Sequence, residues 1–186
     1  MNFENWWQWL ILFGLIGWAI SIYNALVRLR ERSEAAWSDI DVQLKRRHDL
    51  VPNLVATVKG YASHEGETLE AVVRARARAV DAEGPRERGA AESLLGGALG
   101  RLFAVAEAYP ELRASEGFRD LHASLASIET AIQDARRYYN AVVRDLNTRV
   151  QTIPSSLVAR SFGFRQRDFF EIDEGERAVP EVDFDG

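Results

Sequence analysis

The sequence predicts an all-α protein in which an N-terminal transmembrane helix continues into an antiparallel four-helix bundle, with two long and two short helices, followed by a disordered acidic tail. Three observations predict this fold class. No charged residue stands between Glu4 and Arg28. Apolar residues recur at alternating steps of three and four along residues 115–153, which is typical of a helix with one buried face. No segment shows the period of two that indicates a strand.

Composition and charge exclude several function classes. The 186 residues contain no cysteine, which excludes a disulfide framework, a thiolate zinc site and a cysteine nucleophile. The net charge of −5 comes from the C-terminal end, because residues 168–186 contain eight acidic residues and only one arginine. The rest of the chain is nearly neutral, so we expect no nucleic-acid partner.

Residues 1–27 predict a short outside N-terminus and a transmembrane helix. About 20 helical residues span the ~30 Å hydrocarbon core of a bilayer, and the uncharged stretch has this length. Aromatic side chains that favour the headgroup level stand at its two ends: Trp6, Trp7 and Trp9 at one and Tyr23 at the other. The acidic start and the absence of a small-residue cleavage site favour an uncleaved anchor over a signal peptide.

The charges beside this helix predict its orientation. Arg28, Arg30 and Arg32 follow it directly, whereas nothing basic except the α-amino group precedes it. The positive-inside rule therefore places the N-terminus outside and the following bundle in the cytoplasm. Gly14 and Gly17 form a small-residue step through which two anchors can approach closely, although the spacing is three residues instead of the four of the usual dimer motif.

Residues 28–153 predict the bundle. The first long helix continues from the anchor and is interrupted at Ser63–Gly66. Two short helices are expected at about 67–81 and 90–108, because Gly84-Pro85 and Pro110 act as breakers. The last helix has Ser115 as its N-cap and Pro154 as its stop. Its expected core positions are Phe118, Leu121, Leu125, Ile128, Ile132, Ala135, Tyr139, Val142, Leu146, Val150 and Ile153.

The end of the last helix is predicted to return to the bilayer. A helix over residues 28–62 extends ~52 Å away from the membrane, and an antiparallel helix over residues 115–153 returns ~58 Å toward it. Residues 154–170 then mix aromatic and basic side chains, which suits anionic headgroups; alternatively, the aromatic rings close the open end of the bundle. The acidic tail, residues 171–186, is expected to be mobile.

Polar residues interrupt the apolar pattern of the two long helices. Arg47 falls in the apolar stripe of the first, and Pro52 should kink that helix and free the carbonyl of His48. Glu129 and Asn140 lie one residue from core positions of the last helix. A charged layer inside the bundle would set register and partner choice. The candidate members of this structural network are Arg47, Asp49, Glu65, Arg76, Glu129, Arg136 and Asn140.

The order of several short motifs resembles the LemA family of bacterial membrane proteins. These motifs are the stretch Tyr23–Val27, the run Arg47–Val55, the turn Tyr61–Glu65, the pair Ala75-Arg76, the corner Glu107–Leu112 and the segment from Glu129 to Ala135–Asn140. The resemblance implies a single N-terminal transmembrane helix in the bacterial cytoplasmic membrane, an outside N-terminus and a cytoplasmic antiparallel bundle. It implies no reaction.

The sequence favours a non-enzymatic scaffold. We found no Ser/His/Asp triad pattern, phosphate-binding loop or His-Glu-x-x-His motif, so we expect no catalytic residue, cofactor or metal. The leading hypothesis is a membrane-anchored bundle that assembles with copies of itself or with another envelope protein. A second hypothesis is an accessory factor whose acidic tail and kinked first helix recruit a membrane protease or sensor complex. A third is a ligand- or metal-binding bundle using His64, Glu65, Arg76 and Glu129.

Overall fold

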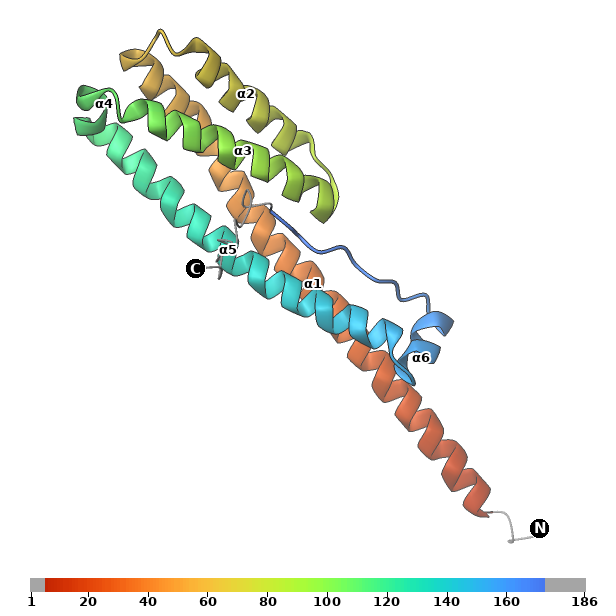
Figure 1. The fold of residues 1–186 in the computed structure, drawn as a ribbon. Coiled ribbons are helices and arrows are strands. Elements are labelled where there is room, and N and C mark those ends of the chain that lie inside the picture. The colour runs from red at the N-terminus through yellow and green to blue at the C-terminus, as the bar shows by residue number, and fades with distance from the viewer. Residues whose placement is uncertain (1–5, 173–186) are drawn as a thin grey trace, which may run out of the picture. The chain divides into compact units, whose positions relative to one another are not determined.

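The computed structural model describes residues 6–172, which contain six helices and no strand. The predicted all-α class is confirmed. In chain order the helices are α1 (Trp6–Tyr61), α2 (Gly66–Asp81), α3 (Gly84–Ala106), α4 (Pro110–Ala114), α5 (Glu116–Gln151) and α6 (Ser155–Ser161), as Figure 1 shows. Four of them correspond to the predicted helices. The short helices α4 and α6 were not predicted, and the acidic tail from residue 173 onward lies outside the described residues.

The helices form two compact units, and α1 and α5 each contribute to both. Unit 1 consists of the chain up to Val42 together with Gln133–Phe169. Unit 2 consists of Gln43–Ile132 together with the residues from Phe170 onward. The division therefore follows the contacts of the two long helices and does not follow the breaks between helices in the sequence.

Unit 2 is a four-helix bundle built from the C-terminal part of α1, the N-terminal part of α5, and α2 and α3, which lie side by side (Figure 1). Removal of apolar side chains from water is the main force that holds such a bundle together. Its core contains Val51, Leu54, Val58, Leu69, Val72, Leu95, Leu102, Leu112, Phe118 and Leu125. Phe118 and Leu125 are among the positions that the three-four spacing of the last long helix predicts.

Unit 1 has a smaller core. Leu26 of α1, Leu146 of α5 and Ala159 of α6 are buried together, and Val158 and Phe164 pack against them. Residues 164–169 continue in an extended chain, whose backbone is held by α5: Tyr139 Oη donates to the carbonyl of Asp168, and the Asn147 amide pairs with the backbone of Arg167. Most of the aromatic and basic segment is thus tied to the helices.

Several local predictions differ from the structure. The break expected at Gly84-Pro85 does separate α2 from α3, but α3 begins at Gly84 and not at about residue 90, because a proline is accepted in the first turn of a helix, where a backbone N–H has no partner within the helix. The residue before Gly84, Glu83, is extended. Ile153, placed among the core positions of the last helix, is exposed because it lies beyond the end of α5. Ser115 is a correct N-cap: its hydroxyl accepts from the backbone N–H of Phe118.

The N-terminal half of α1 is the one candidate membrane span among the described residues. Its apolar side chains, from Trp6 to Ile20, are exposed almost all around the helix. A helix that is hydrophobic on all sides is typical of a membrane span or of a helix buried inside a protein. The burial changes at Leu26, the first residue along the chain that is fully inside a protein core.

The last described residues, Phe170–Ile172, belong to unit 2 and pack against α3 at Gly89. Phe170 is fully buried, and the backbone of Glu171 crosses α3 at Gly89, where a Cβ atom would collide with the Glu171 carbonyl. We expect Gly89→Ala to displace Phe170–Ile172, seen as faster amide hydrogen exchange in these residues. Gly97→Ala, on the same helix with open space at its Cβ, is the matched control and should leave the exchange unchanged. Unchanged exchange in Gly89→Ala would contradict this docking.

Candidate functional site

The candidate site lies in unit 2 around Arg47. Its place in the apolar stripe of α1 buries the side chain, so the guanidinium needs partners inside the bundle. Nη1 lies 3.0 Å from an oxygen of Glu129 on α5 and 3.5 Å from Oε2 of Glu92 on α3. A single arginine therefore pairs with carboxylates from two other helices.

Glu92 is the most deeply buried charged side chain of the described residues, with 1% of its surface exposed. Its Oε1 lies 2.5 Å from Nε2 of His48, the residue that follows Arg47. Its Oε2 lies within ion-pair distance of Arg47 but has no hydrogen bond. Since a buried carboxylate oxygen is costly to leave without a donor, this atom is the one unsatisfied position of the cluster.

Pro52 connects this cluster to α2. A proline inside a helix leaves the carbonyl four residues earlier without its backbone donor, and here that carbonyl belongs to His48. Arg76 fills the place, because its Nε donates to the His48 carbonyl oxygen over 2.7 Å. The helix continues through Pro52 to Tyr61. Because of Pro52, the His48 carbonyl oxygen of α1 is available to accept a hydrogen bond from Arg76 of α2.

This replacement predicts a coupling between Pro52 and Arg76. Arg76→Ala alone leaves the His48 carbonyl without a donor and should cost about 1–3 kcal/mol of stability. In a Pro52→Ala background the backbone N–H of residue 52 can donate instead, so the same change should cost less. A double-mutant cycle from urea unfolding measures the difference. Equal costs in both backgrounds would show that Arg76 does not replace the missing N–H.

A cavity of about 560 Å³ adjoins the charged cluster. Arg47, Glu92 and Glu129 form its polar wall, and apolar side chains form most of the rest. Three glycines of α3 shape it. A Cβ at Gly96 would stand 3.4 Å from the Arg47 guanidinium, whereas Gly97 and Gly100 have open space. The apolar lining is Leu99, Phe103, Leu125, Ala126 and Ile172, with Ser93 and His122 beside it.

The other members of the predicted network lie elsewhere. Asp49 is exposed, and Glu65 accepts a hydrogen bond from Tyr109 Oη at 3.2 Å. Glu65 occupies the N-cap position of α2, but its side chain does not cap that helix. Arg136 and Asn140 are half-buried on the part of α5 that belongs to unit 1.

The Tyr109–Glu65 pair gives unit 2 a pH dependence at alkaline pH. The pKa of Tyr109 is raised from 10.0, first by burial and then by the hydrogen bond and negative charge of Glu65. The native state therefore holds the phenol proton more tightly than the unfolded chain does. This stabilisation is complete below about pH 10 and is lost as the pH rises further.

We expect Glu65→Gln to lower the pKa of Tyr109. Spectrophotometric titration of phenolate absorbance measures this change, and Tyr109→Phe identifies which part of the absorbance belongs to Tyr109. Glu67→Gln, which changes an exposed carboxylate in the first turn of the same helix, is the control and should leave that part of the curve in place. A Tyr109 pKa that is the same in wild type and Glu65→Gln would contradict the contribution of Glu65.

Sequence reasoning missed the two most informative residues, Glu92 and His48. Glu92 stands three residues before Leu95 and seven before Leu99, both buried, so it occupies the apolar stripe of α3 just as Arg47 occupies that of α1. The same signal could therefore have found it. The sequence analysis singled out His48 only for the backbone carbonyl that Pro52 frees and not for its side chain.

All six residues predicted to meet the membrane interface are exposed: Trp6, Trp7, Trp9, Tyr23, Arg28 and Arg30. Tyr23 also contacts two rings of the segment after α6, and the guanidinium of Arg30 lies 5.7 Å from the centre of the Phe164 ring. A Cβ placed on Gly14 or Gly17 would meet no atom within 4 Å from the described residues outside the neighbouring backbone of α1.

The structure does not assemble the predicted metal-binding set. Glu129 pairs with Arg47, Arg76 with the His48 carbonyl, and Glu65 with Tyr109, while His64 is exposed. Within residues 6–172 no group of three histidine or carboxylate side chains is arranged to hold a metal ion.

Comparison with known proteins identifies the family. The family model described as LemA family matches residues 36–184. The chain belongs to the LemA family. This confirms the resemblance found in the sequence motifs, and the matched range covers the helices that build the Arg47 cluster.

The chain shares 27–28% identity with several individual relatives. The chain is 28% identical to magnetosome protein MamQ of Magnetospirillum gryphiswaldense over 174 residues, which is 80% of this chain and 64% of that protein. It is 27% identical over 175 residues to MamQ 2 of Paramagnetospirillum magneticum, with the same coverage. Protein LemA of Metamycoplasma hominis is 27% identical over 158 residues, covering 83% and 71% of the two chains. This LemA-family chain thus spans about two thirds of the length of the MamQ relatives.

Proposed function

We propose that this LemA-family protein is a membrane-anchored helical scaffold that assembles with copies of itself through its N-terminal helix. The observation that carries the proposal is the exposed apolar part of α1, which continues without a break into a folded helical body. Such a helix tethers the body to a bilayer as an integral part of its own structure. The lipid bilayer and a second copy are the partners, and no reaction is assigned.

The orientation follows from the arginines after the span. Arg28 and Arg32 are exposed, and Arg30 is exposed as well, so all three are available to headgroups on one side. By the positive-inside rule the body faces the cytoplasm and the N-terminus the outside of the bacterial cytoplasmic membrane.

The anchor offers a face for self-assembly at Gly14 and Gly17. Small residues let two helix backbones approach closely in lipid, where no hydrophobic force drives helices together. Gly14→Ile with Gly17→Ile should reduce the mass of the protein in mild detergent, measured by light scattering. Leu12→Ile, which changes a large exposed side chain of the same helix, is the matched control and should keep the oligomer. A wild-type protein that is strictly monomeric across concentrations would contradict self-assembly.

The hypothesis that the acidic tail recruits a membrane protease or sensor complex concerns residues 173–186, which lie outside the described residues. It remains a prediction. Deleting the tail and comparing the proteins that crosslink to the full and shortened chains in cells tests it, and an unchanged set of crosslinked proteins would count against it.

The cavity beside Glu92 favours ligand binding as a second candidate function. Its volume lies in the range of small-molecule sites, and such sites combine apolar walls with a few polar groups. Two carboxylates and one arginine line it, and Glu92 Oε2 has no hydrogen bond. These features select an apolar molecule with an amine head that donates to Glu92 and Glu129.

Cyclohexylamine and cyclohexanecarboxylate test this candidate as a matched pair, because they share the ring and differ in charge. The amine should raise the thermal unfolding temperature and Glu129→Gln should weaken that effect, whereas the carboxylate should have none. No shift with either compound would remove this candidate.

A further inference from the structure

Helix α6 and its flanks present an apolar surface that the described residues leave largely exposed. Three large side chains stand out from it: Ile153 is 82% exposed, Leu157 62% and Phe162 63%. The opposite side of α6 is buried at Ser155, Ser156 and Ala159. The helix is therefore fixed by one face and leaves its apolar side chains on the other.

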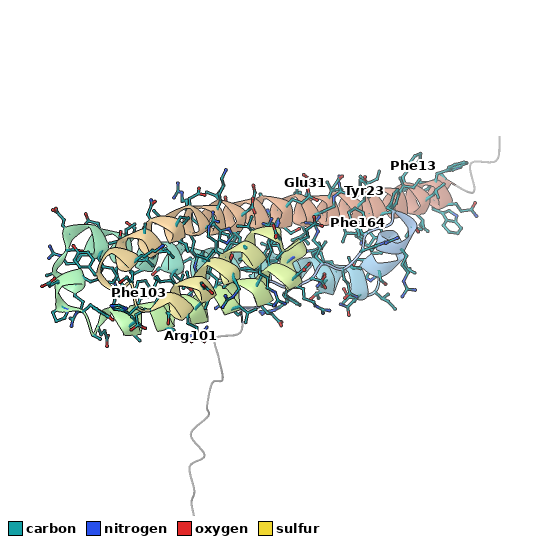
Figure 2. The ribbon with its side chains drawn as sticks, turned by 90° about the horizontal axis from the view of Figure 1, so that it is seen from above. Phe13, Tyr23, Glu31, Arg101, Phe103 and Phe164 are labelled. Atoms are coloured by element: carbon teal, nitrogen blue, oxygen red, sulfur yellow. The ribbon has the colours of Figure 1, made fainter. Side chains whose placement is uncertain are left out.

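This surface is attached to α1 at the end of the candidate span. The ring of Phe162 lies 4.8 Å from that of Tyr23, and the ring of Phe164 lies 5.8 Å from it. Figure 2 shows Tyr23 and Phe164 close together, with Phe13 farther along the same helix. Val158 and Ala159 complete the attachment in the core around Leu26.

The length of the span sets the level of this contact in the bilayer. The ~30 Å hydrocarbon core takes ~20 residues of helix, so a span that begins at Trp6 reaches its inner boundary near Leu26. On α1, Tyr23 contacts the two rings that follow α6, and Leu26 lies in the same small core as Ala159 of α6. The exposed side chains of α6 therefore stand at the boundary between hydrocarbon and headgroups.

The charges around this surface are basic. Arg160 and Arg165 are exposed between and beside the apolar side chains, and Arg28 is exposed on α1. Arg167 is instead paired with Glu34 of α1. Apolar side chains flanked by arginines are the pattern of a segment that lies in the interface of an anionic leaflet.

We infer that Ile153, Leu157 and Phe162 insert into the inner leaflet while Arg160 and Arg165 bind anionic lipid headgroups, so that α6 holds unit 1 at a fixed depth beside the span. The occupant of this surface is the bilayer itself. This rests on the proposed membrane anchor and adds a second membrane contact, about 130 residues along the chain from the first. The sequence alone was compatible with two roles for the aromatic residues of this segment, contact with the membrane and closure of the bundle. Phe164 packs against the core of unit 1, which suits closure, whereas Phe162 is exposed, which suits contact with the membrane.

The absence of cysteine permits a direct test with the full-length chain, because each introduced cysteine is unique. Single variants Leu157→Cys and Phe162→Cys are labelled with the environment-sensitive dye NBD and reconstituted into phosphatidylcholine vesicles with or without 30% phosphatidylglycerol. Phe13→Cys reports the span, and Val42→Cys, an exposed residue of α1 in the same unit, is the matched solvent control. Brominated lipids quench dyes in the membrane, and iodide quenches dyes in water.

We expect brominated lipids to quench the labels at residues 13, 157 and 162, and iodide to quench the label at residue 42. Phosphatidylglycerol should increase the quenching of the label at residue 162, and Arg160→Glu with Arg165→Glu should remove that increase. Labels at 157 and 162 that iodide reaches, while that at 13 is protected, would overturn the inference and leave the anchor intact. A label at 13 that iodide also reaches would instead overturn the anchor. Equal quenching in both lipids would overturn the preference for anionic headgroups.

Discussion

Arg47→Ala should destabilise unit 2 by about 3–5 kcal/mol, the largest effect that we expect from a single substitution in the body. Removal of the guanidinium leaves Glu92 buried with His48 as its remaining ion-pair partner and breaks the pair with Glu129. Breaking a buried ion pair from one side costs more than the pair contributes, because the other charge stays out of water. Urea unfolding followed by circular dichroism measures the change.

Two controls separate this effect from ordinary loss of side-chain volume. Arg46→Ala removes the exposed neighbouring arginine and should change stability by less than about 0.5 kcal/mol. Arg47→Met with Glu92→Leu replaces both charges by apolar groups of similar size and should recover much of the loss. A cost for Arg47→Ala as small as that for Arg46→Ala would show that the buried cluster does not stabilise the unit.

The second large effect concerns the membrane anchor. Leu15→Arg with Ile16→Arg places two charges near the centre of the apolar stretch, where each costs about 2.5–3.5 kcal/mol on insertion into a membrane. The pair should move most of the protein from the membrane to the soluble or aggregated fraction, measured by fractionation and immunoblotting. Leu15→Ile with Ile16→Leu is the matched control and should remain in the membrane. Membrane retention of the arginine variant at the wild-type level would contradict a span at this position.

The sequence was sufficient for the helices because their signals are local. Spacing of apolar residues depends only on the helical period, so Phe118, Leu125 and Leu146 could be placed in a core without knowing their partners. Helix ends were less predictable. The helix after the break at Gly84-Pro85 was expected to begin at about residue 90 but begins at Gly84, because a proline that stops a helix from inside is accepted in its first turn.

The candidate site could be predicted only in part. Arg47 is recognisable in the sequence as a charge in an apolar stripe, and Glu129 as a charge one residue from a core position of the last helix. The ion pair of Arg47 with Glu92 depends on how α3 lies against α1 within unit 2, which no local pattern encodes. The contact between Arg76 and the His48 carbonyl was predictable in part. Pro52 predicts that this carbonyl lacks its backbone donor, but only the fold shows which side chain reaches it.

The segment after α5 required the structure most. Its aromatic and basic residues were compatible both with packing against the helices and with contact with lipid. The sequence pattern of the segment cannot separate these two interpretations. The structure separates them by exposure, since Phe164 packs in the core of unit 1 and Phe162 faces outward.

The mass of the protein in mild detergent, measured by light scattering across concentrations, tests the scaffold most directly. The full chain is compared with a chain beginning at Ser21, which lacks most of the apolar stretch but keeps Ile22, Tyr23 and Leu26 for the core of unit 1. We predict a defined oligomer for the full chain and a folded monomer for the shortened one. Monomers in both cases would contradict self-assembly and would make the protein a docking module for a different partner.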